Sequence, residues 1–340
     1  MKILAIDIGT GTQDIMLYDT SKELENSHKL VLPSPHLYIS QKIRQTNNNI
    51  YLKGEIMGGG KIKNTLLEHM ERGYEVVMSE TSAKTIRDDP KQVKQYGIKI
   101  DDEANYPTYT KITLNDLDLE KLEKTLKSYD LNYSFDKIAV AVQDHGYNEN
   151  MGDRDFRFEK IREKLTEPIP SKDFAFRDNL PDYYTRMNAV KRTLEKNKIK
   201  DYIIMDTKFA SIAGMCEDKE AKKLNSFIAV DIGNGHTTAA SIKDGLIQGV
   251  FEHHTRNLTN EKLEYYLKRL AKGTITNSEV KDDHGHGACV INPIKIEKVI
   301  VTGPKRNLIE NTNLNWHHAT PAGDVMMTGT VGLIKSIGEL

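Results

Sequence analysis

The chain has 340 residues, which is enough for two domains because single domains commonly hold about 100–200 residues. Its 48 lysines and arginines are balanced by 49 aspartates and glutamates, so it lacks the basic excess of a protein whose main ligand is nucleic acid. Two cysteines exclude a disulfide framework, and no apolar run reaches the roughly 20 residues of a membrane-spanning helix. We therefore expect a cytoplasmic protein that binds neither nucleic acid nor a membrane.

The first half of the chain alternates short apolar runs with helical patterns. Residues 2–8 predict a buried strand and residues 13–19 a strand that returns from it, so the pair forms a hairpin. The polar residues 20–48 are expected to form exposed connections, and residues 85–110 show no clear pattern. The remaining predicted elements are strands at 49–53, 74–78, 111–114, 137–142 and 202–205, and helices at 118–128, 156–166, 182–197 and 207–215. This alternation predicts a layered, mainly parallel α/β domain.

The second half begins in the same way after a polar crossing at 216–225. Its predicted elements are strands at 227–232, 237–242, 246–252 and 299–302, and helices at 259–271 and 322–337. We therefore predict a first domain at 1–215 with an insertion at about 20–110. The second domain is predicted at 226–340, and its last helix returns toward the first domain.

An internal repeat is the most informative feature of the sequence. The segment 7–14, DIGTGTQD, is echoed by the segment 231–238, DIGNGHTT, and each follows a buried strand. Glycines let the backbone approach an anion closely, and successive N–H groups can then point at one cluster of phosphate oxygens. An aspartate at each strand end, Asp7 and Asp231, can hold hydrated Mg²⁺ through water. Two facing hairpins therefore predict a polyphosphate site, although a single Asp-x-Gly hairpin is also a common tight turn.

Five segments resemble the actin, hexokinase and Hsp70 superfamily in its own order. The two hairpins resemble its two phosphate loops, and residues 299–304, VIVTGP, resemble its adenosine motif. Residues 206–214 and 322–332 resemble its two connecting helices. The resemblance implies an α/β fold of two ribonuclease-H-like (actin-like ATPase) domains with a nucleotide cleft between them. It also implies ATP and Mg²⁺ as ligands.

The same resemblance assigns roles to individual residues. Asp7 and Asp231 are expected to orient hydrated Mg²⁺, and Gly303 is expected to pack on the adenosine. The residues expected to cradle the phosphates are Thr10, Gly11, Thr12, Gly233, Asn234, Gly235, His236 and Thr237.

At family level the chain resembles an archaeal group defined as a domain of unknown function. Residues 57–60, MGGG, and the later Asp88-Asp89 contribute to this resemblance. Members are labelled pyruvate formate-lyase activating enzymes. Such activators need three closely spaced cysteines for an iron–sulfur cluster, which Cys216 and Cys289 cannot supply.

Three polar residues at strand ends are candidates for catalysis. In this superfamily a polar group at a comparable strand end positions water or a substrate hydroxyl near the γ-phosphate. Asp144 and His145 follow the strand 137–142, and either is a candidate general base, although the segment is also compatible with an ordinary polar turn. Asp206 precedes a helix, so it is either catalytic or an N-cap that accepts free N–H groups.

Histidines and glycines elsewhere leave further alternatives open. His284 and His286 alternate in an extended loop and can share a metal ion, or else line a substrate site or face solvent. Gly58, Gly59 and Gly60 precede a helix and either bind an anion through free N–H groups or only permit a sharp turn.

The leading functional prediction is an ATP–Mg²⁺ protein that hydrolyses ATP or transfers its γ-phosphate to an unidentified small molecule. One alternative is a nucleotide-dependent switch or activator of a partner protein, and another is an actin-like assembly subunit. The sequence predicts no particular oligomeric state. Fold by itself does not distinguish these functions.

Overall fold

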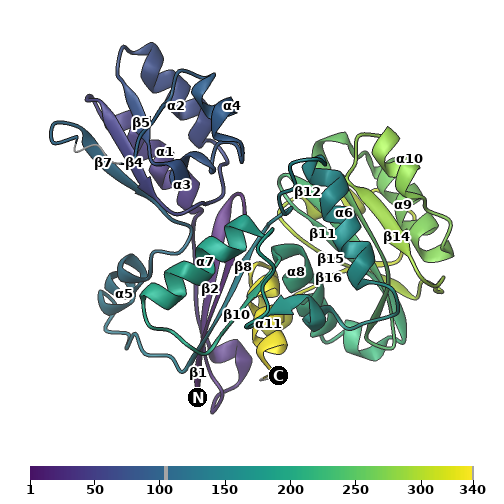
Figure 1. Cartoon of the computed structure of the whole chain (residues 1–340). Coiled ribbons are helices and arrows are strands. Elements are labelled where there is room, and N and C mark those ends of the chain that lie inside the picture. Colours follow the sequence, from purple (N-terminus) through teal and green to yellow (C-terminus); the bar gives the residue numbers. More distant parts are fainter. Residues whose placement is uncertain (103–105, 339–340) are drawn as a thin grey trace.

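The computed structural model describes residues 1–102 and 106–338, which form three bodies (Figure 1). These residues contain two six-stranded sheets and one four-stranded sheet. The two larger sheets lie on either side of two central helices, and the small sheet stands apart above the first (Figure 1).

The sheet of the first half has the strand order β3-β2-β1-β8-β10-β9. β1, β2 and β3 form an antiparallel meander, and β8 and β10 run parallel to β1. β1 and β8 are buried on both faces, which explains their nearly continuous apolar sequences. The strands are β1 Lys2–Ile8, β2 Thr12–Asp19, β3 His28–Pro33, β8 Lys137–Val142, β9 Ala175–Phe176 and β10 Tyr202–Met205.

The sheet of the second half repeats this arrangement with the order β14-β13-β12-β11-β15-β16. β11, β12 and β13 form the meander, and β15 runs parallel to β11. The strands are β11 Ser226–Ile232, β12 His236–Lys243, β13 Leu246–His254, β14 Gly287–Val290, β15 Lys298–Thr302 and β16 Trp316–His318. A meander followed by parallel strands is the ribonuclease-H-like order, so the expected fold class of two such α/β domains is confirmed.

The insertion folds as a small α/β body of its own. Its sheet has the order β6-β5-β4-β7, and all its strands are parallel. The strands are β4 Ile50–Gly54, β5 Val76–Met78, β6 Lys99–Ile100 and β7 Thr110–Leu114. The helices are α1 Pro35–Gln45, α2 Ile62–Glu71, α3 Glu80–Ala83 and α4 Pro90–Lys94.

The prediction that residues 20–48 form only exposed connections was wrong. This segment contains β3 and α1. β3 was missed because none of its residues is buried, so its sequence shows no alternation. α1 buries Ile39 and Ile43 on one face, where they join the core of the insertion.

The remaining helices cover the two larger sheets and connect them. They are α5 Leu119–Lys127, α6 Asp153–Lys164, α7 Thr185–Lys196, α8 Thr207–Cys216, α9 Asn260–Lys272, α10 Asn277–Asp282 and α11 Thr328–Ile337. Short 3₁₀ turns lie at 24–26, 171–174, 221–223, 255–257, 306–309, 321–323 and 325–327. α6 packs against β14, so this part of the first half lies on the second sheet (Figure 1). No helix in the described parts of the chain combines the length and apolar character needed to cross a membrane.

Two small-residue helices, α8 and α11, form the centre of the molecule. A Cβ atom on Gly214 would lie 1.8 Å from the carbonyl oxygen of Thr328, and one on Gly332 would lie 1.9 Å from that of Ala210. Only glycine therefore permits this close approach. One continuous core includes apolar residues of both larger sheets and of both helices. The two halves thus meet at α8 and α11.

Candidate functional site

A cavity of about 430 Å³ lies where the two larger sheets and the insertion meet. Its walls include both Asp-x-Gly hairpins, the first residues of α8 and α11, and the turn after β15. The insertion contributes Gly58, Gly59 and Gly60. The volume is that of an ordinary small-molecule site, for which about 300–1,000 Å³ is typical.

The two hairpins are built alike and face each other across the cavity. In the first, the N–H of Gly9 donates to the oxygen of Thr12 at 2.9 Å; in the second, the N–H of Gly233 donates to the oxygen of His236 at 3.0 Å. The two tips come close together, because a Cβ atom on Gly11 would lie 2.7 Å from Nδ2 of Asn234. Backbone from both halves is therefore available to one ligand.

Most of the residues expected to cradle phosphate line this cavity. They are Thr10, Gly11, Thr12, Gly233, Asn234, Gly235 and His236. Thr237 is different: it is fully buried, and its hydroxyl exchanges a hydrogen bond of 3.0 Å with Thr255. Thr237 therefore supports the second hairpin from behind. Its side chain alternates with that of His236 along the strand and points to the opposite face.

Two carboxylates of the first hairpin share the cavity wall. Asp7 and Asp14 are paired across β1 and β2, and Thr207 donates a hydrogen bond of 2.5 Å to Asp7. Burial, followed by the charge of Asp14, raises the pKa of Asp7 to about 8. Burial also raises the pKa of Asp14 to about 7. The Oδ1 atom of Asp14 is buried and finds no hydrogen-bond partner among the described residues. A pair of desolvated carboxylates is an arrangement that a bound cation stabilises.

The aspartate of the second hairpin has a basic partner instead. Nζ of Lys208 lies 3.0 Å from Oδ2 of Asp231, and the hydroxyl of Ser211 donates to the same oxygen at 3.0 Å. Lys208 also donates to the carbonyl oxygen of His236 at 3.1 Å, so it connects α8 to the second hairpin. Lys208 was missed in the sequence, although it is the one charged residue of α8, whose other residues are small or apolar.

The turn after β15 presents backbone to the cavity. Gly303 has a φ of +96°, which favours glycine, and a Cβ atom there would lie 2.4 Å from the carbonyl oxygen of Ile232. Thr302 donates to the hydroxyl of Thr328 at 3.0 Å, which ties the turn to the start of α11. A Cβ atom on Gly329 would lie 1.8 Å from Oδ2 of Asp7, so α11 also begins against the first hairpin.

The three catalytic candidates occupy different positions. His145 lines the cavity, but neither Asp144 nor Asp206 is among the described residues that line it. Asp144 accepts N–H bonds from Arg186 and Met187, at 2.8 and 2.9 Å, and so caps the start of α7. Burial raises the pKa of the Asp144 carboxyl.

Asp206 has the contacts expected of an N-cap. It accepts the N–H of Lys208 at 3.0 Å at the start of α8. Its carboxylate also pairs with Arg157, whose Nη1 lies at 2.8 Å, and the same guanidinium binds Glu252 at 2.9 Å. Arg157 thus joins α6, α8 and β13 in one buried network.

The insertion is connected to the cavity by residues that sequence reasoning missed. The guanidinium of Arg186 binds Asp116 at 2.6 Å and donates to the carbonyl oxygen of Gln143 at 2.9 Å. Asp116 also accepts the N–H of Gly58 at 3.1 Å. His36 lies against Gly60 and forms a hydrogen bond of 2.7 Å with the carbonyl oxygen of Thr10. The insertion therefore contacts and supports the first hairpin.

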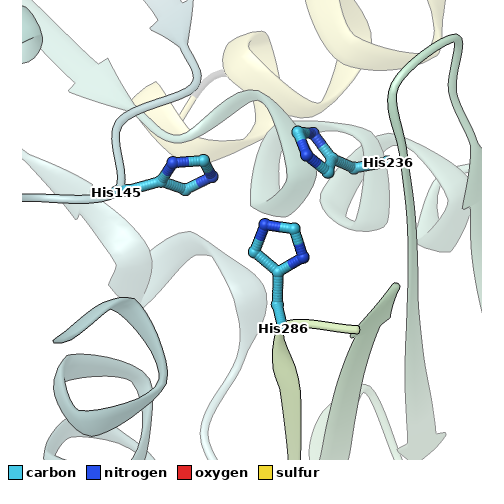
Figure 2. Close-up of side chains that lie close together, drawn as sticks. All are labelled: His145, His236 and His286. Carbon is cyan, nitrogen blue, oxygen red and sulfur yellow. The ribbon is translucent and has the colours of Figure 1, made fainter. Parts of the chain in front are cut away.

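Three histidines lie close together, and two of them, His145 and His236, line the cavity. Figure 2 shows His145, His236 and His286 pointing toward a common space, and one ring nitrogen from each lies within 4.8 Å of the others. Burial lowers the pKa of His236 to about 3 and that of His286 to about 2, and it also lowers the pKa of His145. The three rings are therefore neutral at pH 7.

Comparison with solved structures finds similar chains of low sequence identity. An inorganic polyphosphate/ATP-glucomannokinase from Arthrobacter sp. strain KM is 11% identical with a TM-score of 0.42, and the match covers 99% of this chain and 98% of that one. The activator of the 2-hydroxyisocaproyl-CoA dehydratase from Clostridium difficile is 11% identical with a TM-score of 0.38, covering 100% and 95%. A ROK hexokinase from Thermus thermophilus is 11% identical with a TM-score of 0.34, covering 99% and 98%.

Comparison with protein families gives one match over most of the chain. A model described as "Putative pyruvate format-lyase activating enzyme (DUF1786)" matches residues 57–308. No curated protein matches the sequence.

Proposed function

We propose that this chain, which belongs to the family whose model matches residues 57–308, binds ATP with Mg²⁺ in the cavity and cleaves its γ-phosphate. The phosphoryl group passes either to water or to the hydroxyl of a small molecule. One observation carries the proposal: a single cavity is lined by both hairpins, by the Gly303 turn and by two neighbouring carboxylates.

The residues around the cavity fit a magnesium–nucleotide complex. Backbone N–H groups and the hydroxyls of Thr10 and Thr12 supply donors for phosphate oxygens. Asp7 and Asp14 would hold hydrated Mg²⁺, and the unpartnered oxygen of Asp14 is available to one of its waters. When bound, the ion neutralises charge on the phosphate oxygens. Gly303 leaves room for the nucleoside.

His145 is the catalytic candidate that can contact a reacting molecule. It lines the cavity beside the second phosphate loop. We therefore assign the positioning of the nucleophile to His145. Asp144 and Asp206 then hold the two helices that frame the site, through their contacts at the starts of α7 and α8.

The label of the family suggests an iron–sulfur enzyme, but the cysteines do not fit one. Cys216 and Cys289 are free, and burial raises the pKa of their thiols to about 12 and about 11. A cluster needs thiolates, and two thiols do not supply the three that such activators use. We therefore derive no step through a cluster.

A second candidate function is a nucleotide-dependent switch whose closure a partner protein recognises. The contact between α8 and α11 favours it, because both helices begin at the cavity and cross at Gly214 and Gly332. A change in either hairpin would pass directly to these helices. Slow turnover together with a large nucleotide-induced change in shape would distinguish the switch from a kinase.

Calorimetry on the full chain tests the proposed function. ATP should bind with one-to-one stoichiometry in Mg²⁺ and raise the melting temperature, and both effects should weaken in EDTA. Asp19→Asn, at the far end of the same hairpin, serves as a matched control for Asp7→Asn. Phosphate release with and without a panel of hydroxyl-bearing acceptors then separates hydrolysis from transfer. Absence of both ATP binding and a melting shift would refute the proposal.

A further inference from the structure

The three histidines of Figure 2 come from three separate segments of the chain. His145 follows β8 in the first half, His236 begins β12, and His286 immediately precedes β14. Their ring nitrogens nevertheless lie within 4.8 Å of one another. Such convergence of three neutral donors from distant segments is the arrangement that a metal site requires.

We propose that His145, His236 and His286 bind one divalent transition-metal ion, with Zn²⁺ as the expected ion. Imidazole is a preferred ligand of such ions, and three histidines with one open position form a common catalytic zinc site. Zn–N bonds of about 2.0–2.1 Å place tetrahedral ligand atoms about 3.3 Å apart. Movement of the rings by about an ångström closes the site, since the nitrogens already lie within 4.8 Å.

Buried atoms without partners provide independent support. His286 is 1% exposed, and its Nδ1 atom has no hydrogen-bond partner among the described residues. Oε1 of the fully buried Glu252 is likewise unpartnered within the described chain and lies 3.8 Å from Nε2 of His286. A buried polar atom without a hydrogen-bond partner destabilises the folded state. A cation between the rings would use a ring lone pair and face the carboxylate.

The surroundings of the rings also fit a metal centre. Ligating histidines usually have a hydrogen-bond partner that fixes the orientation of the ring. Gln143 provides this contact for His236, because its Oε1 lies 3.2 Å from Nδ1 of that ring and can accept its N–H. Gln143 is thus a positioning residue for the proposed site.

The position of the site relates it to the nucleotide. His145 and His236 line the nucleotide cavity, so an open coordination position would face it. There the ion would bind an oxygen of water or of an acceptor hydroxyl. This role rests on the proposed function, whereas metal binding itself does not. The ion would also join the two halves, because His145 belongs to the first and the other two ligands to the second.

Titration of the metal-free full chain with Zn²⁺, and with Co²⁺ as a spectroscopic probe, tests the site. One ion per chain should bind, and Co²⁺ should give the intense visible absorption of a low-coordinate complex. His145→Gln, His236→Gln and His286→Gln should each weaken binding by about 10-fold or more. His254→Gln is the matched control, because its ring lies 4.7 Å from that of His286 but outside the triad.

The outcomes are separable from those for nucleotide. ATP binding without stoichiometric Zn²⁺ or Co²⁺ binding would overturn the metal site and leave the proposed function standing. Metal binding without ATP binding would support the metal site and overturn the proposed function. Equal loss in His254→Gln and in the triad variants would also overturn the assignment. Circular dichroism melts identify any variant that fails to fold. If His286→Gln, whose ring is buried, fails to fold, metal binding by His145→Gln and His236→Gln, at the cavity wall, tests the site.

Discussion

The two hairpins have the same backbone but different charges. Asp7 lies opposite Asp14, whereas the equivalent Asp231 lies opposite Thr238. Asp231 is paired with Lys208 at 3.0 Å, and the first hairpin instead concentrates two carboxylates at one place. Repetition of a fold therefore does not make the two halves equivalent.

Because their charges differ, we expect the two hairpins to bind different parts of a ligand in the cavity. The second hairpin is already electrically compensated by Lys208, so its loop can meet phosphate without a further cation. The first hairpin holds two desolvated carboxyl groups whose pKa values are raised, and a bound cation would favour their charged forms. We therefore expect the magnesium complex to depend more on Asp7 and Asp14 than on Asp231.

Breaking the Lys208–Asp231 pair should have the largest effect on stability. Each partner is nearly buried, with side chains 8% and 11% exposed. Lys208→Met or Asp231→Asn should lower the free energy of unfolding by about 3–5 kcal/mol, because one buried charge is left alone. Urea unfolding measures the loss. The double variant should recover part of it, and strictly additive losses would contradict the pairing.

Asp7→Asn should keep the stability of the fold but weaken nucleotide binding. Its buried carboxylate is disfavoured in the folded state, so removing the charge should preserve or raise stability without nucleotide. Affinity for ATP in Mg²⁺ should fall by about 10- to 100-fold, as expected when a group that orients a metal is lost. Calorimetry in Mg²⁺ and in EDTA measures both affinities. A loss as large in EDTA as in Mg²⁺ would show that Asp7 does not act through the ion.

The sequence predicted the elements whose signal is local. Apolar strands that end in Asp-x-Gly, such as β1 and β11, are recognisable because buried strands of this kind read as continuous apolar runs. The prediction that the two hairpins face each other came from the internal repeat and from the resemblance to the superfamily. β3 and α4 were not predicted, since one is unburied and the other is a helix of five residues.

The rest of the site depends on contacts that no local pattern encodes. Lys208 becomes important only because α8 carries it to the second hairpin, 23 residues away in sequence. His145 and His286 converge from opposite halves of the chain. The polar turn at Asp144 also holds His145, which lines the cavity. It could not indicate which of the two neighbouring side chains enters the cavity.

The pH dependence of the free energy of unfolding should show the contribution of the Asp7 carboxyl in the first hairpin. Burial raises the pKa of Asp7 from 3.8 to about 8, so between these values the folded state holds a proton that the unfolded state has released. This contribution to stability is complete below about pH 3.8 and is lost as the pH rises through about 8. In EDTA the wild type should therefore lose stability over this range, and Asp7→Asn should lose less. Identical slopes would contradict the assignment.

The smallest expected effect lies at the contact between the hairpin tips. Asn234 is exposed, and its amide lies beside Gly11, so it can donate to a phosphate that both loops hold. Asn234→Ala removes one such donor, which is worth about 1 kcal/mol, or about fivefold in nucleotide affinity. Calorimetry should detect this loss without any change in melting temperature. Asn26→Ala, an exposed asparagine outside the cavity, should leave affinity unchanged. If ATP bound Asn234→Ala as tightly as the wild type, the second tip would contact phosphate through its backbone alone.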